Sequence, residues 1–349
     1  MPRVRFLPRK SNSVWKLNKN PLDASPTPVL VLFGPTASGK TNILLRLFES
    51  GLGRRGPAAE VVSADSMQVY RGMDIGTAKP SAQEREKLPH HLIDIRNPNE
   101  QFNAGDFVRL ALEAIADITG RGAFPVVCGG TGFYLKNLIL GLPESPPADA
   151  EIRAALKGEL REKGAAALMG ELAAGDPVSA QRIHLNDTYR LLRALEVLRL
   201  SGRPLSSFGV SLTHSYSFTL VGLSRPRQEL YRRIDARCAA MFAQGLPDEV
   251  RRLCDMGYTP RDPGLRAIGY REFFVQGEAD DYRLSHDIPG VQALVAQNSR
   301  RYAKRQITFF ASLPGIQWLE AGDDDTETAE RLKEIIERKE STNDTNKHE

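Results

Sequence analysis

Cysteine is scarce in this sequence, and the few that occur are poorly placed for cross-linking. The 349 residues include only Cys128, Cys238 and Cys254, which are far apart and odd in number. This pattern suits neither a disulfide framework nor a metal site. Histidines also lack ligand spacing, and the adjacent pair His90 and His91 is expected to serve structure. We therefore expect a reducing compartment, the cytoplasm, as the setting.

Long apolar runs are missing, as are acidic residues near the start. No apolar run approaches the roughly 20 residues that a helix needs to cross a bilayer, so we expect no membrane partner. Residues 1–20 contain basic side chains but no acidic one, and they lack the apolar segment of a signal peptide. A transit peptide is an alternative, but Pro2 and Pro8 weaken an amphipathic helix. Residues 1–27 are therefore predicted to be a disordered basic tail.

Short apolar runs are what the sequence offers for a core. They lie at residues 29–33, 60–63, 125–128 and 218–223, with a fifth candidate at 316–319. Turn residues and then a helical pattern follow the first four runs. Strands that alternate with helices predict βαβ units and an α/β fold with a parallel sheet. Because sites in such sheets lie at the carboxyl ends of the strands, the residues after each run are the candidates.

The composition changes between residues 141 and 209, which are rich in Ala, Leu, Glu and Arg and contain no strand-like run. Prolines near its start and a Gly and a Pro near its end delimit this helical stretch. We predict a tail at 1–27, a discontinuous α/β core at 28–145 and 213–322, an all-helical insertion at 146–212, and a charged helix and tail at 323–349.

The first apolar run leads into "GPTASGKT", which fits the phosphate-binding pattern G-x-x-x-x-G-K-[ST]. Backbone N–H groups of such a loop, with the positive end of the next helix, bind a phosphate or diphosphate. Lys40 would neutralise phosphate oxygens, and Thr41 would bind Mg²⁺. The pattern predicts a phosphate ligand without identifying it. The phosphate loop consists of Gly34, Pro35, Thr36, Ala37, Ser38, Gly39, Lys40 and Thr41.

Asp65 follows the second run, where it can face the phosphate loop. One interpretation makes it the N-cap of the next helix, with Ser66 sharing that task. The other makes it a general base or a Mg²⁺ partner beside the phosphate. The segment "GMDIGTAKP", residues 72–80, is longer than a simple connection needs, which favours a functional loop.

The third run ends in a glycine-rich turn around Thr131. Gly129, Gly130 and Gly132 would let the backbone approach a ligand closely, although a tight turn is the simpler interpretation. The rim that this turn would share with the phosphate loop and Asp65 favours a site.

Basic residues cluster in other segments. Arg233 and Arg237 lie four residues apart on a predicted helix, as an anion clamp or as a solvated face, and the sequence does not decide between the two. In "QNSRRYAKRQITFF", basic and aromatic residues are interleaved at helical spacing. Such clusters are typical of a surface that binds a nucleic-acid backbone. Their members are Arg301, Lys304, Arg305, Arg182, Arg190, Arg193, Arg199, Arg266 and Arg271.

Taken together, these segments resemble the tRNA dimethylallyltransferase family, also called tRNA isopentenyltransferases. The motifs run in order along the chain and are "GPTASGKT", "DSMQVYRGMDIGTAKP", "HHLIDI", "GGTGFYLK", "RIHLNDTYRLLRALEV", "LRAIGYRE" and "YAKRQITFF". The second is far more specific than the first. The resemblance implies a core like that of P-loop kinases. It also implies transfer of a dimethylallyl group from dimethylallyl diphosphate to N6 of the adenosine 3′ of the anticodon, in tRNAs that read codons beginning with U.

The resemblance further implies roles for individual residues. The phosphate loop and Mg²⁺ would hold the donor's diphosphate, Asp65 would accept the N6 proton, and Thr131 and Arg233 would stabilise the leaving diphosphate. The insertion would clamp the anticodon stem-loop of a tRNA, and we expect the enzyme to be a monomer. The implied tRNA contacts are Asp65, Ser66, Met67, Gln68, Thr131, Arg153, Tyr189, Arg190, Leu191, Leu192, Arg193, Arg266, Ala267, Ile268, Gly269, Tyr270, Arg271, Lys304, Arg305 and Gln306.

The sequence departs from the family pattern near the end of its last motif. Phe309 stands where Trp is common and Ala311 where Arg is frequent, so we expect one phosphate contact to be missing. Two other functions compete. A small-molecule or nucleotide kinase is supported by the loop and the sheet alone, and the motif at 65–80 argues against it. A non-catalytic RNA-binding protein is disfavoured because Lys40, Asp65 and Thr131 are all present.

Overall fold

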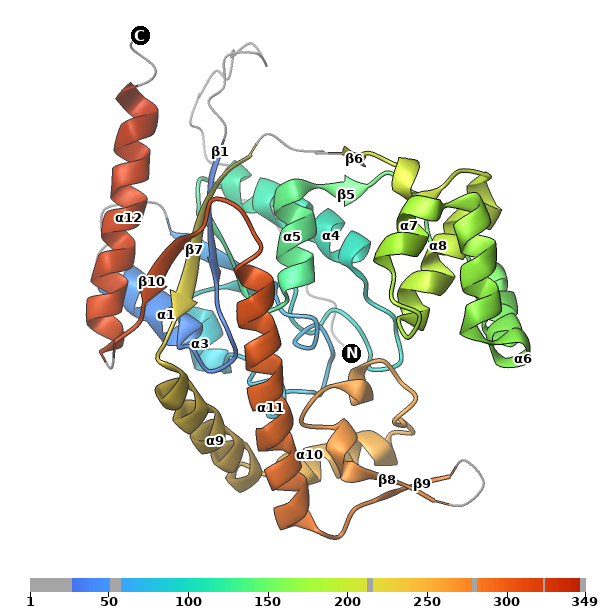
Figure 1. The fold of residues 1–349 in the computed structure, drawn as a ribbon. Helices are drawn as coiled ribbons and strands as arrows, with labels where there is room; N and C mark the ends of the chain where they lie inside the picture. The colour runs from blue at the N-terminus through green and yellow to red at the C-terminus, as the bar shows by residue number, and fades with distance from the viewer. Residues whose placement is uncertain (1–26, 51–57, 212–215, 278–280, 323, 346–349) are drawn as a thin grey trace, which may run out of the picture.

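The structure, a computed structural model, describes residues 27–50, 58–211, 216–277, 281–322 and 324–345. The predicted basic tail lies outside these ranges, apart from Thr27. A six-stranded parallel sheet in the order β10-β7-β1-β4-β2-β3 forms the centre (Figure 1), which confirms the predicted α/β fold. Its strands are β1 (Thr27–Phe33), β2 (Ala59–Ala64), β3 (His90–His91), β4 (Phe124–Gly129), β7 (Tyr216–Ser224) and β10 (Gln317–Glu320).

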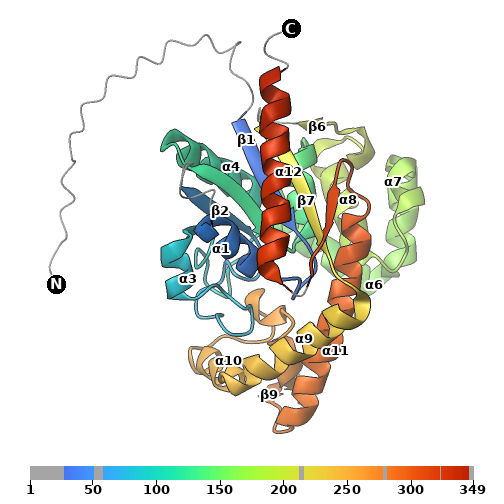
Figure 2. The same cartoon turned by 90° about the vertical axis from the view of Figure 1, so that its left-hand side faces the viewer.

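Helices bury both faces of this sheet. They are α1 (Lys40–Ser50) and α12 (Asp325–Thr345) on one face, and α4 (Ala104–Gly120) and α5 (Gly132–Leu140) on the other. The short α3 (Ala82–Lys87) contains no buried residue. Val31 and Phe33 of β1 enter the core with α4 and α5, whereas Leu30 and Leu32 enter the core with α1 and α12. In Figure 2, α12 and α1 lie in front of the strands. Because successive side chains of a strand point to opposite faces, a strand covered on both sides reads as a continuous apolar run.

All five apolar runs are strands, and the short edge strand β3 is the one strand of the central sheet that the runs do not indicate. Its His91 places Nε2 at 2.7 Å from Oε2 of Glu60 on β2. Arg121, directly after α4, donates to the same carboxylate, and this hydrogen bond is the main reason that the pKa of Glu60 is lowered to about 2. His91 thus has a structural contact, as expected, whereas His90 also lines the cavity described below.

A third layer lies beyond the carboxyl ends of the strands (Figure 1). It contains α9 (Arg227–Ala243), α10 (Leu246–Asp255), η2 (Gly264–Arg266), η3 (Arg271–Phe273), β8 (Phe274–Gln276), β9 (Tyr282–Leu284) and the long α11 (Ile288–Phe310). Leu246, Val250 and Phe273 form its core together with Val69 and Met73, which come from the segment after β2. The layer therefore holds that segment against the carboxyl ends of the strands.

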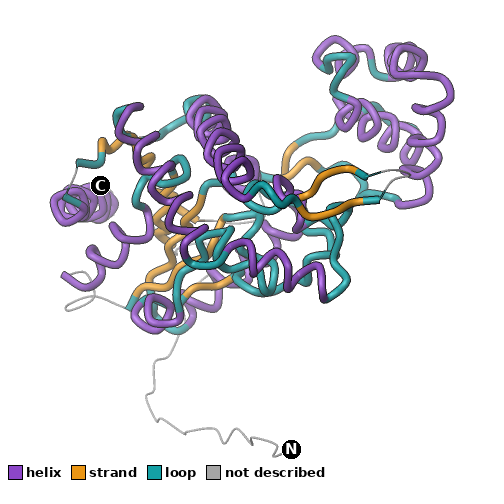
Figure 3. The backbone as a smooth tube through the Cα atoms, turned by 90° about the horizontal axis from the view of Figure 1, so that it is seen from below, coloured by secondary structure: helices purple, strands orange, loops and turns teal. Residues whose placement is uncertain are grey.

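The insertion forms a separate helical group, which Figure 3 shows set apart from the sheet. It comprises α6 (Ala150–Gly175), α7 (Pro177–Arg182), α8 (Thr188–Ser201) and η1 (Leu205–Ser207) around its own leucine core. One detail differs from the prediction of an all-helical segment. The two segments that lead into and out of the insertion run antiparallel, and in them β5 (Leu142–Pro143) pairs with β6 (Val210–Ser211).

The cysteines and the helix lengths can be compared with what the sequence predicts. Cys128, Cys238 and Cys254 are free thiols. Within the described residues, every helix is too short or too polar to cross a lipid bilayer.

Candidate active site

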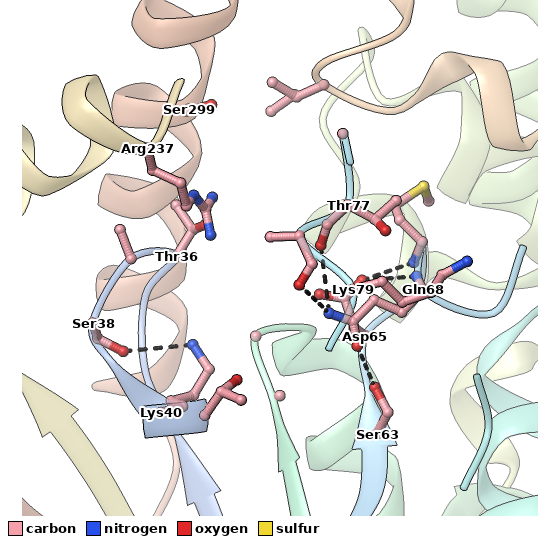
Figure 4. Close-up of a pocket in the computed structure, with 18 of the residues that line it drawn as sticks. Thr36, Ser38, Lys40, Ser63, Asp65, Gln68, Thr77, Lys79, Arg237 and Ser299 are labelled. Atoms are coloured by element: carbon pink, nitrogen blue, oxygen red, sulfur yellow. Dashed lines mark hydrogen bonds between the residues drawn. The ribbon is translucent and has the colours of Figure 1, made fainter. Parts of the chain in front are cut away.

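A cavity of about 750 Å³ opens at the carboxyl ends of the central strands. The cavity is lined by the phosphate loop after β1, the segment after β2, the turn after β4, and one face each of α9 and α11. Figure 4 shows two facing walls. One carries Thr36, Ser38, Lys40 and Arg237, and the other carries Asp65, Gln68, Thr77 and Lys79. The structure therefore brings the phosphate loop and Asp65 to the same space.

The phosphate loop closes around the ammonium of Lys40. Its Nζ donates to the backbone oxygens of Gly34 and Pro35, both at 3.0 Å. Ala37 and Gly39 have positive φ values of 64° and 97°, and such turns make backbone N–H groups converge on an anion. Burial lowers the pKa of Lys40, so an anion in the cavity would restore the charged form.

Two arginines of α9 reach the phosphate loop. Arg233 donates from Nε to the backbone oxygen of Ala37 at 3.1 Å, and Arg237 hydrogen-bonds the hydroxyl of Thr36. Both line the cavity, and burial lowers the pKa of Arg237. The geometry thus supports the anion clamp over the solvated face. Arg237 is absent from the residues that the resemblance implied, and the four-residue spacing from Arg233 was its signal in the sequence.

Asp65 is both a cap and a wall of the cavity. Its Oδ1 accepts from the N–H groups of Met67 at 2.8 Å and Gln68 at 3.3 Å, so it caps a turn instead of the predicted helix. The same carboxylate lines the cavity opposite Lys40. Because a carboxylate has two oxygens and about four acceptor positions, capping leaves it able to accept a proton.

Gln306 of α11 ties the two walls together. It accepts from the Thr36 N–H at 2.9 Å and donates from Nε2 to the Gly130 backbone oxygen at 2.7 Å. Thr131, next in the chain, accepts from the Ser66 N–H at 3.0 Å. These bonds fix the phosphate loop, the glycine-rich turn and the Asp65 segment relative to one another. Both ends of the Gln306 amide are used inside the protein, although the resemblance implied a tRNA contact.

The glycines of the turn permit close approach within the chain itself. A Cβ on Gly129 would lie 2.2 Å from the backbone oxygen of Ala64, and one on Gly132 would lie 2.3 Å from Cδ1 of Phe309. These are distances that real Cβ atoms do not reach, so larger residues would push β2 or α11 away. The need for glycine is therefore explained by packing around the site. Phe309, where the family pattern favours Trp, is the residue packed on Gly132.

Glu249 of α10 holds the loop "GMDIGTAKP" from behind. Its carboxylate accepts from the N–H groups of Asp74 at 3.0 Å, Ile75 at 2.9 Å and Gly76 at 3.1 Å. It also accepts from the hydroxyl of Tyr270 at 2.6 Å, and its exposure is 1%. A buried carboxylate that accepts four hydrogen bonds fixes the loop more firmly than glycine and proline alone could.

Glu249→Gln is expected to destabilise the fold by about 3 kcal/mol, because an amide turns one accepting oxygen into a donor that faces buried donors. Urea unfolding followed by circular dichroism measures this. Glu113→Gln is the matched control, since Glu113 is exposed and its one ion pair within the described residues is with Arg109, one turn away on α4. Equal unfolding midpoints for the two variants would contradict the anchoring role of Glu249.

The residues implied as tRNA contacts divide by their surroundings. Tyr189 is 73% exposed on α8 beneath the guanidinium of Arg153, and Lys304 and Arg305 are exposed on α11. Arg193 instead hydrogen-bonds the backbone oxygen of Pro146 inside the insertion. Leu191, Leu192 and Tyr270 pack in cores, where RNA cannot reach their side chains. Ala267 is buried as well but lines the cavity.

Comparisons with known proteins identify the family. Residues 68–313 match the IPP transferase family. A tRNA dimethylallyltransferase of Geobacter sulfurreducens is 45% identical over 85% of this chain and 93% of its own length. A tRNA dimethylallyltransferase 2 of Geotalea uraniireducens is also 45% identical, over 84% of this chain and 92% of that protein.

Solved structures agree as well. A tRNA isopentenylpyrophosphate transferase from Bacillus halodurans superposes with a TM-score of 0.66 and 35% identity, covering 92% of this chain and 99% of that one. A eukaryotic dimethylallyltransferase acting on tRNA superposes with a TM-score of 0.67 and 25% identity, over 85% of this chain and 74% of that one. The chain therefore belongs to the tRNA dimethylallyltransferase family, the IPP transferases.

Proposed function

We propose that the protein transfers a dimethylallyl group from dimethylallyl diphosphate to N6 of the adenosine 3′ of the anticodon, in tRNAs that read codons beginning with U. The products are N6-isopentenyladenosine and diphosphate. The observation that carries this proposal is one cavity with an anion-binding wall, built on Lys40, and a carboxylate wall, built on Asp65. Membership of the family supports tRNA as the acceptor.

The anion-binding wall suits the donor's diphosphate. As the C–O bond to the allylic carbon breaks, negative charge grows on the departing diphosphate. Lys40, Arg233 and Arg237 line the cavity, where they can stabilise this charge. Thr131 is not among the described residues that line the cavity, but its hydroxyl accepts from the N–H of Ser66, which does line it.

Mg²⁺ fits this wall as an ion held mainly by the substrate. Among the described residues, no group of three or more His, Cys, Asp or Glu side chains could hold a metal by itself. Mg²⁺ in phosphate sites uses one or two protein oxygens with substrate phosphates and waters, and Thr41 supplies such an oxygen in the cavity. When bound, the ion would neutralise diphosphate charge.

The carboxylate wall suits the acceptor. An exocyclic adenine amine is a poor nucleophile, so a base must take its proton while the N6–C bond forms. Asp65 is placed for this, and the proton passes to its carboxylate. The adenosine must leave its stack to reach a cavity between protein walls. Tyr189 is exposed on α8 of the insertion, and Arg305 is exposed on α11. Aromatic and Arg side chains are those on which unstacked RNA bases stack.

A transfer assay tests this directly. The protein is incubated with labelled dimethylallyl diphosphate, Mg²⁺ and an unmodified tRNA whose anticodon loop has adenosines at positions 36 and 37. We expect label in N6-isopentenyladenosine after nuclease digestion and mass analysis, and none when the target adenosine is replaced by guanosine. Phosphoryl transfer from ATP without prenyl transfer would support the kinase alternative instead. Binding of tRNA with no transfer would support the non-catalytic alternative.

A further inference from the structure

Arg225 connects the phosphate loop to the C-terminal helix. It lies between β7 and α9, and its side chain is 0% exposed. Its Nε donates to the backbone oxygen of Ser38 at 2.9 Å, and Nη1 donates to that of Gly322 at 2.6 Å. Its Nη2 pairs with Oδ1 of Asp325, the first residue of α12, at 3.0 Å. Each nitrogen of this guanidinium therefore has an assigned acceptor.

The contact lies directly against the phosphate loop. A Cβ on Gly39 would be 3.1 Å from Nη2 of Arg225 and 3.3 Å from Oδ1 of Asp325, so the pair packs on the loop at Gly39. The φ of Gly39 is +97°, and the loop curvature there depends on this residue. The described residues that line the cavity do not include Arg225, so it acts through the loop and not on the substrate.

The partner of Arg225 stands on a firmly packed element. Leu332 and Ile336 of α12 share a core with Leu44 and Leu47 of α1, the helix that follows the phosphate loop. The start of α12 is thereby held beside the start of α1. Burial lowers the pKa of Arg225, and the nearby charge of Arg233 adds to this effect. Asp325 opposes both, because a buried guanidinium without its carboxylate is costly.

We propose that Arg225 and Asp325 are a positioning pair that couples the C-terminal helix to the donor site. By holding the Ser38 carbonyl outward, the pair keeps the phosphate loop in the shape that binds a diphosphate. The inference rests on the proposed function, since it concerns the same diphosphate site. It gives the charged C-terminal helix a part in donor binding, whereas the sequence marks it only as a terminal appendage.

The test compares Asp325→Ala and Arg225→Lys with Arg331→Ala. Arg331 lies on the same helix, but it donates to the backbone oxygen of Glu320 on β10, at 3.1 Å. Binding of inorganic diphosphate with Mg²⁺ is measured by calorimetry, and KM is measured separately for donor and tRNA. We expect the first two variants to weaken diphosphate binding and raise donor KM roughly tenfold, the size of one lost charge-assisted hydrogen bond. KM for tRNA stays unchanged, and Arg331→Ala matches wild type.

Two results would overturn this inference. One is an equal change in Asp325→Ala and Arg331→Ala, and the other is wild-type diphosphate affinity in folded Asp325→Ala. Should Asp325→Ala fail to fold, Asp325→Asn takes its place, because the amide oxygen still accepts from Arg225 without the charge. It is expected to weaken binding less than Arg225→Lys, and identity with wild type in both would count against the pair. Wild-type protein that binds no diphosphate would instead contradict the proposed donor site itself.

Discussion

Asp65→Asn is expected to slow prenyl transfer by about 10²–10⁴-fold while tRNA binding is retained, the loss typical of removing a general base. The asparagine oxygen can still accept from the N–H groups of Met67 and Gln68, so the turn after β2 keeps its shape. What disappears is the ability to take the N6 proton. Single-turnover transfer with labelled donor gives the rate, and filter binding gives the tRNA affinity.

Asp65→Ala separates the two tasks of this residue. It removes the base and the cap together, so it should show the same loss of rate and, in addition, a lower melting temperature, because a lost cap costs about 1 kcal/mol. If Asp65→Asn transferred near the wild-type rate while Asp65→Ala did not, the carboxylate would be a cap alone. The proton would then have to pass to another group.

The fold follows from local features to a large extent. The runs at 29–33, 60–63, 125–128 and 218–223 were recognisable because strands buried on both faces need continuous apolar sequence. The edge strand β3 has only two residues, His90 and His91, which is too short for any period to show. The β5–β6 pair at the base of the insertion likewise depends on where the chain returns, and two residues per strand carry no pattern.

The site was predicted where its residues stand next to a strand end, and less well where they come from distant helices. The phosphate loop, Asp65 and Thr131 follow strands, so the sheet itself brings them together. Glu249 and Gln306 instead meet partners 173 and 270 residues away, at Gly76 and Thr36, and no local pattern marks such pairs.

Burial explains why some residues that the resemblance assigns to tRNA contact pack inside the protein instead. Leu191 and Leu192 lie in a motif that the resemblance assigns to tRNA contact, but α8 presents only part of its surface to solvent. These two side chains fall on the face that closes the core of the insertion. A motif of consecutive residues on a helix therefore mixes exposed residues, such as Arg190, with packing residues. The division between them becomes visible only in three dimensions.

Arg233→Met and Arg237→Met are each expected to lower the rate of transfer by about 10²–10³-fold, the usual cost of removing one donor that stabilises developing charge. Arg237→Lys should recover only part of this, because an ammonium keeps the charge and loses the planar fork. Arg232→Met is the matched control on the same helix. Its side chain is 73% exposed and pairs with Glu229, so wild-type rates are expected.

The kinetics of Arg237→Met decide what Arg237 contributes to transfer, since its position allows two roles. It hydrogen-bonds the Thr36 hydroxyl, and it also faces the cavity. If it only shaped the phosphate loop, Arg237→Met would weaken the binding of donor and leave the rate at saturating donor unchanged. If its charge acts on the departing diphosphate, the rate at saturating donor falls, because that interaction grows as the C–O bond breaks. We expect the second result, because Arg237 and Lys40 face the same side of the cavity opposite Asp65.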